Sequence, residues 1–388
     1  MKILIVLSRF PYPLDKGDKL RAFYQIKSLS QKHEIFLFCL NDQKRISNES
    51  FDVIKQYCKQ VEVVDVSVFS IFINLIKAFI SGLPFQSGYF YSKKAKNAII
   101  KLINSVQPDR VFCQMIRTTE YLIGVPVPST LDYQDALSKG VERRIVGANV
   151  FLRFILKMEL KRLLKYEALV FEKFNNKTII SLTDRDFIPH KDNSQIKVIR
   201  NGVDMDYFTP KKNSTKQYSL LFTGNMGYSP NVEAACFLAN EILPLVQLKI
   251  PSANLLISGT RPSPQVTQLQ NDSVTVSGWV DDMRDSYDNA SCFVAPMLSG
   301  SGLQNKLLEA MAMKLPCITT SLANNALGAT HGKQILVADN ANDIANEIIQ
   351  LIEDAQKAEN IAQQGYEFVI GNYNWESINF LLEEIICS

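Results

Sequence analysis

Short apolar runs alternate with longer segments of helical periodicity along most of the chain. In the first half this pattern predicts a helix at 19–31 and strands at 2–7, 34–40, 61–66, 110–114, 129–132 and 178–181. Strands that alternate with helices are typical of a parallel sheet covered on both faces. The first half is therefore predicted to be a doubly wound α/β domain.

A second series of the same kind follows the polar stretch at 210–217. It predicts helices at 231–249 and 305–313 and strands at 219–222, 253–258, 274–277, 292–295 and 317–319. A chain of 388 residues is long enough for two domains of ordinary size. We therefore expect two Rossmann-like domains, 1–181 and 182–388, with a C-terminal helix at about 374–388 that packs back on the first.

The amino-acid composition argues against several classes of protein for this chain. Hydrophobic residues make up 46% of the chain and charged residues 21%, which excludes general disorder. A net charge of +3 argues against a dedicated nucleic-acid binder. The seven cysteines and three histidines show neither a disulfide framework nor the spacing of metal ligands, so we predict a reduced, cytoplasmic chain without a metal site.

Charge and apolar residues are unevenly distributed. Residues 139–177 contain ten Lys/Arg and four Asp/Glu, and within them 149–174 mixes aromatic, aliphatic and basic residues. Residues 69–80 form a second apolar stretch. Each segment is either a core-facing helix with one solvated side or a helix that lies on an anionic membrane, where a lipid-linked substrate would be found.

Ligands of open α/β sheets bind outside the carboxyl ends of the strands. If the two domains face each other, these ends border a cleft between them. The loops after the predicted strands are therefore candidate ligand contacts, among them Asn225, Trp279 and Val280. No Gly-x-Gly-x-x-Gly follows the first strand, which disfavours a dinucleotide-dependent dehydrogenase.

The most informative stretch is GSGLQNKLLEAMA at 300–312, a glycine loop between a predicted strand and a helix. Backbone amides in such a loop can surround an anion, and the helix start attracts it. Lys306 would neutralise a phosphate, and Glu309 would accept hydrogen bonds from a ribose diol. The alternative is an ordinary helix start with a surface ion pair. The predicted ligand contacts in this stretch are Gly300, Ser301, Gly302, Leu303, Gln304, Asn305, Lys306 and Glu309.

The same stretch, with LPCITT at 315–320, resembles the donor-site signature of glycosyltransferase family 4, the glycosyl transferases group 1. RNGVD at 200–204 is similar to the family's entry to its second domain. TGNMGYSPN at 223–231 and FPYPLDKGD at 10–18 are similar to the branch of sugar transferases associated with exopolysaccharide and exosortase loci. The resemblance implies the GT-B fold, two Rossmann-like domains that face each other across a cleft.

The resemblance also implies roles for individual residues. Glu309 corresponds to the second glutamate of the family's Glu-x7-Glu pair, which holds the ribose, whereas the first, which holds the donor sugar, falls at Ser301. The family's usual Arg and Lys diphosphate clamp after Gly224 is missing, and we expect Arg261 and Lys306 to replace it.

In the first half, Gly17 lies near the donor diphosphate in similar enzymes, where its glycine either permits close backbone approach or forms an ordinary turn. Asp135 lies where relatives place a polar residue beside the reacting sugar carbon. It either orients the acceptor hydroxyl or caps the following helix.

The implied function is metal-independent, retaining transfer of a sugar from a nucleotide-sugar donor, UDP- or GDP-linked. The acceptor would be a glycan or lipid-linked glycan of an exopolysaccharide or capsule, handled in the cytoplasm or on the inner face of the membrane, without a further cofactor. Two alternatives remain open: a nucleotide-sugar epimerase of the same fold, and a non-catalytic scaffold that binds sugar nucleotides.

Overall fold

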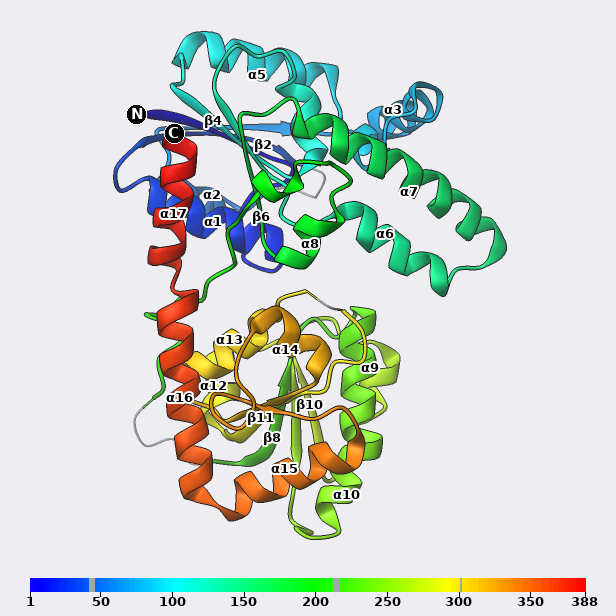
Figure 1. Ribbon diagram of the computed structural model, residues 1–388, viewed down its shortest axis with the longest axis vertical. Coiled ribbons are helices and arrows are strands. Elements are labelled where there is room, and N and C mark those ends of the chain that lie inside the picture. The colour runs from blue at the N-terminus through cyan, green and yellow to red at the C-terminus, as the bar shows by residue number, and fades with distance from the viewer. Residues whose placement is uncertain (42–45, 212–215, 301) are drawn as a thin grey trace. The chain divides into compact units, whose positions relative to one another are not determined.

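A computed structural model describes residues 1–388 except 42–45, 212–215 and 301, and the chain divides into two compact units (Figure 1). The first unit comprises Met1–Arg200 and Glu376–Ser388, and the second comprises Asn201–Trp375. Each unit contains one parallel sheet and its own hydrophobic core.

The sheet of the first unit has the strand order β3-β2-β1-β4-β5-β6-β7, and all its pairings are parallel. Its strands are β1 (Lys2–Leu7), β2 (Glu34–Asn41), β3 (Gln60–Asp65), β4 (Arg110–Gln114), β5 (Ser129–Asp132), β6 (Asn176–Ile179) and β7 (Lys197–Val198).

The helices of the first unit cover both faces of this sheet. In β1, every residue from Ile3 to Leu7 is at most 1% exposed, so both faces of the strand are covered. This double burial explains why β1 is a continuous apolar run instead of an alternating one. The helices are α1 (Gly17–Leu29), α2 (Asn48–Lys55), α3 (Val68–Ser81), α4 (Phe85–Phe90), α5 (Lys93–Val106), α6 (Leu137–Val146), α7 (Val150–Phe171), α8 (Leu182–Phe187) and α17 (Trp375–Cys387).

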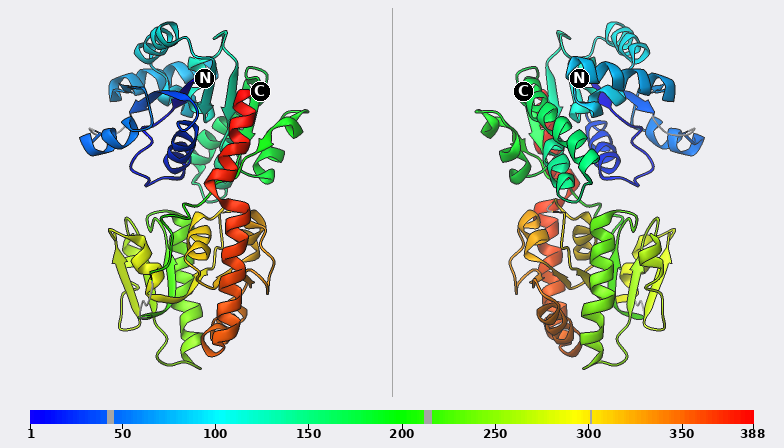
Figure 2. Two further views of the ribbon diagram at one scale, coloured as in Figure 1. Left: turned by 90° about the vertical axis from the view of Figure 1, so that its left-hand side faces the viewer. Right: turned by 90° about the vertical axis from the view of Figure 1, so that its right-hand side faces the viewer.

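The helix α17 lies against the first unit, as Figure 2 shows in red. Glu383 accepts a hydrogen bond of 2.8 Å from Lys32, and the Asn379 amide donates to the Tyr24 carbonyl oxygen at 3.0 Å. Leu382 is fully buried. The last helix of the chain thus completes the core of the unit in which the chain begins.

The predicted strand at 178–181 is wrong by two residues. The strand β6 ends at Ile179 because Ser181 is the N-cap of α8, where its hydroxyl accepts a hydrogen bond from the Asp184 amide at 3.0 Å. The short strand β7, which the apolar pattern did not indicate, pairs with β6. The boundary expected after residue 181 therefore falls between β6 and α8, inside the first unit.

The sheet of the second unit has the order β10-β9-β8-β11-β12-β13, again with parallel pairings only. Its strands are β8 (Tyr218–Thr223), β9 (Leu255–Ser258), β10 (Val274–Gly278), β11 (Ala290–Ala295), β12 (Cys317–Thr319) and β13 (Leu336–Val337). Its helices are α9 (Ser229–Phe237), α10 (Leu243–Gln247), α11 (Pro264–Thr267), α12 (Met283–Asp288), α13 (Asn305–Ala312), α14 (Ser321–Leu327), α15 (Ala341–Glu353) and α16 (Ala355–Tyr373).

The long helix predicted at 231–249 begins two residues earlier and is not regular. Ser229 and Pro230 open α9, since proline is favoured in the first turn of a helix. A π-helical segment at Leu238–Ile242 then leads into α10, which carries Pro244 in its first turn. Proline lacks the amide that a regular α-helix would use, which accounts for the change in hydrogen bonding before it.

None of the helices in the parts of the chain that the structure describes is both long and apolar enough to cross a membrane.

Candidate functional site

The loops that follow β8, β9 and β10 are held against one another by glycines. The Gly224 amide donates to the Ser258 carbonyl oxygen at 3.1 Å, and the Gly259 amide donates to that of Gly278 at 2.9 Å. A Cβ atom at Gly259 would lie 1.8 Å from the Gly224 carbonyl oxygen. The φ angle is positive at both positions, +142° at Gly259 and +153° at Gly224. Only glycine allows this approach, so the carboxyl ends of the strands share one compact edge.

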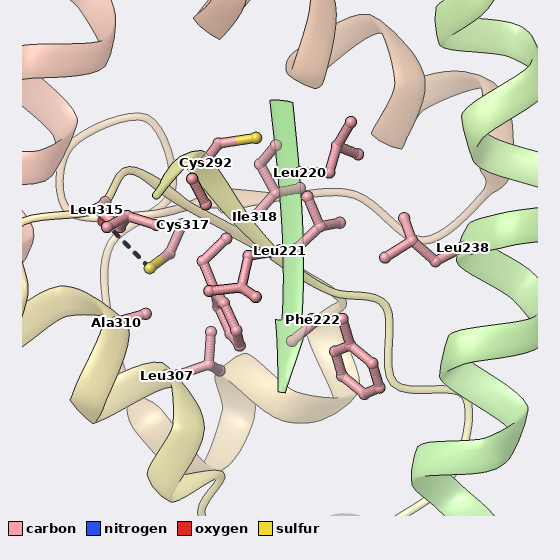
Figure 3. Packing of buried hydrophobic residues seen from close by; sticks show 14 of the residues in the cluster. Leu220, Leu221, Phe222, Leu238, Cys292, Leu307, Ala310, Leu315, Cys317 and Ile318 are labelled. Atoms are coloured by element: carbon pink, nitrogen blue, oxygen red, sulfur yellow. Dashed lines mark hydrogen bonds between the residues drawn. The ribbon is translucent and has the colours of Figure 1, made fainter. Parts of the chain in front are cut away.

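The helix α13 is fixed beside this edge by its apolar face. Figure 3 shows Leu307 and Ala310 directed toward the core around β8, and both are fully buried. At the start of the helix, the Gln304 side-chain amide donates to the carbonyl oxygens of Gly300 and Gly302 at 3.2 and 3.0 Å. These bonds shape the glycine loop, and the burial of the apolar face sets the direction of Lys306 and Glu309.

Lys306 is a half-buried cation with a single short polar contact. Its Nζ atom donates to Asn231 Oδ1 at 2.5 Å, and it lies 3.9 Å from the Met297 sulfur and 4.7 Å from the centre of the Phe222 ring. Burial lowers the pKa of Lys306 to about 7, against a smaller opposite effect of the Glu309 carboxylate. An anion brought to this amine would stabilise its charged form.

Glu309, one turn further along α13, accepts a hydrogen bond from the Tyr287 hydroxyl at 2.8 Å. That hydroxyl also contacts the Thr223 hydroxyl at 3.0 Å, at the end of β8. Burial raises the pKa of Glu309, while the Tyr287 bond and the Lys306 charge oppose the rise. Tyr287 is fully buried, so it holds the carboxylate in one position.

The structure joins the predicted Arg261 loop to the loop after β8. The Met226 amide donates to the Thr260 carbonyl oxygen at 2.8 Å, and the Ser263 amide donates to that of Met226 at 3.1 Å. Arg261 is exposed, has a φ of +53°, and forms no ion pair with any residue that the structure describes. Asn225 accepts a bond from the Gly227 amide at 3.0 Å, so its side chain shapes this loop.

The other predicted donor contacts lie at the same edge. Trp279 follows β10 and is 68% exposed, with Val280 half-buried beside it. Asn305 begins α13, and its side-chain oxygen is buried with no hydrogen-bond partner among the described residues. Gly302 and Leu303 are half-buried in the glycine loop, whereas Ser301 lies outside the described residues.

Asp135 and Gly17 belong to the first unit. Asp135 is an exposed residue, but desolvation of its carboxylate, together with the negative charges of Asp184 and Asp132, raises its pKa to about 6 against the opposite effect of Arg21. It does not cap α6, because Glu167 accepts the hydrogen bonds of the Ser138 amide and hydroxyl, at 3.1 and 2.5 Å.

Gly17 is the first residue of α1, and a Cβ atom there would have no neighbour within 4 Å. Packing within the first unit therefore does not require a glycine at this position.

A buried ion pair supports the Asp135 loop. The Arg21 guanidinium donates to both Asp132 oxygens, at 2.6 and 3.2 Å, and both side chains are fully buried. The Gln134 amide and the Thr178 hydroxyl donate to Asp132 Oδ1 at 3.3 and 2.9 Å. With these partners the buried charges are compensated, and the end of β5 is held rigidly.

Sequence reasoning missed three residues of the second-unit site: Asn231, Tyr287 and Thr223. Asn231 lies in the first turn of α9, directly after Pro230, and ends the 223–231 stretch quoted above, so a signal for it was present. Tyr287 lies 22 residues before its partner Glu309, and nothing in the local pattern marks it. Among the described residues, no group of three or more His, Cys, Asp or Glu side chains is arranged to hold a metal ion.

Residues 217–354, which make up most of the second unit, match the family described as glycosyl transferases group 1. An uncharacterised 44.6 kDa protein of the cps region of Klebsiella pneumoniae is 24% identical over 394 residues, covering 97% of each chain.

Solved structures show the same fold over the full length. HepE of Anabaena, solved in complex with UDP, is 14% identical with a TM-score of 0.69, covering 99% of each chain. Sucrose-phosphate synthase of Thermosynechococcus elongatus is 14% identical with a TM-score of 0.71, covering 99% of this chain and 98% of its own. The predicted GT-B fold, with two Rossmann-like sheets of seven and six strands, is thereby confirmed.

Proposed function

We propose that this chain, whose residues 217–354 match the glycosyl transferases group 1, is a retaining glycosyltransferase. It transfers a sugar from a UDP- or GDP-linked donor to a glycan or lipid-linked glycan of a surface polysaccharide. The observation that carries the proposal is the half-buried Lys306 amine beside Glu309 and the glycine loop. The relative from the cps region supports a role in surface polysaccharide synthesis. HepE, which has been solved with UDP-glucose, supports a nucleotide sugar as the donor.

In the proposed reaction, the protein binds the donor and neutralises the charge that develops on the leaving diphosphate. Lys306, Arg261 and the amides at the start of α13 supply this stabilisation without a metal ion. Glu309 accepts hydrogen bonds from the ribose. Asn225 in the loop after β8, and Trp279 and Val280 in the loop after β10, contact the nucleotide. In the first unit, we assign Gly17 to donor binding and Asp135 to orienting the acceptor hydroxyl.

The test is a transfer assay with donor titration by calorimetry. We expect Lys306→Ala and Glu309→Ala each to lower donor affinity and turnover by tenfold or more. For affinity this is a loss of about 1.4 kcal/mol or more in binding free energy. Lys333→Ala and Glu359→Ala, exposed positions elsewhere on the second unit, serve as matched controls. Unchanged binding and turnover in both site variants would overturn the assignment.

The same assay separates the two alternatives. A nucleotide-sugar epimerase converts the donor in the absence of any acceptor, so a changed donor sugar in that reaction would favour it. A non-catalytic scaffold binds the donor tightly and transfers nothing to any acceptor of its own locus.

We further propose that the protein works at the cytoplasmic face of an anionic membrane through two exposed apolar groups in the first unit. The helix α3 exposes Val68, Phe69, Phe72, Ile76, Phe79 and Ile80, between 48% and 83% each. The end of α6 and the start of α7 expose Val146, Val150, Phe151 and Phe154, between 69% and 84% each. We call these ten residues the α3–α7 surface.

The two groups lie on neighbouring helices and carry positive charge beside them. Arg162 of α7 donates to the carbonyl oxygens of Ala78 and Phe79 of α3, at 3.2 and 2.9 Å. Exposed cations accompany the apolar residues along α6 and α7: Arg143, Arg144, Arg153, Lys157 and Lys161. Apolar side chains flanked by cations suit the interface of an anionic bilayer, where each cation adds about 1 kcal/mol.

Co-sedimentation with vesicles tests this surface. We expect binding to vesicles that contain phosphatidylglycerol, weaker binding to pure phosphatidylcholine, and release by salt. The double variant Phe69→Ser/Phe151→Ser should lose binding, whereas Leu248→Ser, an equally exposed apolar residue of the second unit, should retain it. Equal sedimentation of all three proteins would contradict the proposal.

A further inference from the structure

The loop that leads into α13 contains no carboxylate, yet a carboxylate from another helix lies against it. Its residues from 299 to 303 are Ser, Gly, Ser, Gly and Leu. Glu233 of α9 accepts a hydrogen bond from the Ser299 hydroxyl at 2.6 Å through one oxygen. Its other oxygen accepts one from the Ser229 hydroxyl at 3.0 Å.

The turn of α9 that carries Glu233 also contacts the rest of the site. Asn231, two residues earlier, accepts the hydrogen bond from the Lys306 amine. Pro230 borders the glycine loop, since a Cβ atom built on Gly300 would lie 3.5 Å from the Pro230 Cβ. Glu233 is therefore held beside the glycine loop by the same helical turn that holds the proposed phosphate-binding cation.

The charge of Glu233 is not neutralised by its surroundings. The side chain belongs to an exposed residue, and no lysine or arginine in the described part of the chain forms an ion pair with it. Its partners are two neutral hydroxyls. A carboxylate has about four acceptor positions, so it can accept further hydrogen bonds or exchange the present partners for hydroxyls of a ligand. A carboxylate whose described partners are only hydroxyls suits a polyhydroxylated ligand.

We propose that Glu233 binds the hydroxyl groups of the donor sugar and selects against donors whose sugar carries a carboxylate. The inference rests on the proposed function, because it takes the donor to be a nucleotide sugar. Hydrogen bonds from sugar hydroxyls to the carboxylate are charge-assisted and strong. A uronic acid placed there would instead be repelled by a second negative charge.

Isothermal titration with the full-length protein tests this role, using UDP, GDP, UDP-glucose, GDP-mannose and UDP-glucuronic acid as probes. We expect Glu233→Gln to weaken binding of the preferred neutral nucleotide sugar about tenfold. Binding of the nucleoside diphosphate, which has no sugar at this position, should not change. The preference for UDP-glucose over UDP-glucuronic acid should decrease. Glu241→Gln, eight residues further along, is the matched control, since Glu241 is exposed and lies on the same helical segment.

The outcomes separate this inference from the proposed function. If Glu233→Gln binds every probe as the wild type does, while Lys306→Ala loses nucleoside diphosphate binding, the inference is overturned and the proposed function stands. Equal weakening of the nucleoside diphosphate and the nucleotide sugar by Glu233→Gln also overturns it, because Glu233 would then act by holding the loop. A wild-type chain that binds none of the probes overturns both.

Discussion

The amine of Lys306 lies 2.5 Å from the side-chain oxygen of Asn231, although 75 residues separate the two in the chain. Asn231 belongs to the helix after β8, and Lys306 belongs to the helix after β11. These strands are neighbours in the sheet, with Leu221 opposite Phe293. Because both are parallel, the segments that follow them meet at one edge, where we place the diphosphate.

The lowered pKa of Lys306 predicts proton uptake when the donor binds. With a pKa of about 7 in the free protein, the amine is only partly charged at neutral pH. A bound diphosphate raises this pKa, so affinity should be constant well below pH 7 and should fall as the pH rises above it. Titrations at pH 8 in buffers of different ionisation enthalpy measure the protons taken up.

Lys306→Arg is the control for this pH dependence, since a guanidinium stays charged throughout the range. The variant should bind a nucleotide sugar with an affinity that does not depend on pH between 7 and 9. The same pH dependence in the variant and the wild type would assign the proton to another group.

Tyr287→Phe removes the hydrogen bond that holds Glu309. The change leaves the Thr223 hydroxyl and a Glu309 oxygen without this partner, and should lower the free energy of unfolding by about 1–2 kcal/mol. Loss of the bond also raises the pKa of Glu309 further, so donor affinity should weaken most at low pH. Urea unfolding and calorimetry measure the two effects, with Tyr366→Phe on α16 as the control. A stable variant with wild-type affinity would show that Tyr287 has no positioning role.

Two glycines differ in what their substitution should do. Gly259→Ala places a Cβ atom against the Gly224 carbonyl oxygen, and should destabilise the second unit by at least ~2 kcal/mol. The Cβ atom that Gly17→Ala adds has no neighbour within 4 Å. The free energy of unfolding of this variant should therefore equal that of the wild type or be slightly higher. A loss of turnover in Gly17→Ala at unchanged stability would indicate that this backbone approaches the donor. Unchanged turnover would leave Gly17 as a turn residue.

The raised pKa of Asp135 predicts an acidic limb in the activity profile. If the carboxylate orients the acceptor hydroxyl, turnover at saturating donor should fall as the pH drops below about 6, where Asp135 becomes protonated. Asp135→Asn should lower turnover and abolish this limb. Persistence of the limb in the variant would assign it to another group.

Much of the fold followed from local pattern. The apolar runs of β1 and β4 and the helix at α13 are visible in the sequence because each strand is buried on both faces and each helix on one. The glycines and the lysine of the 300–312 stretch likewise indicated an anion site, since glycine loops and helix starts are local features. A predicted boundary was wrong where a helix cap ends a strand: β6 stops at Ile179 because Ser181 is the N-cap of α8.

By itself, the sequence determined the doubly wound architecture, and it predicted an anion site at the glycine loop, because periodicity and loop composition are properties of neighbouring residues. Only the tertiary structure decided which side chains surround Lys306 and Glu309. Asn231, Tyr287 and Glu233 reach the glycine loop and its helix from segments 22 to 75 residues away. Their positions depend on the order of the parallel strands and on the burial of helix faces, and no short stretch of sequence contains that information.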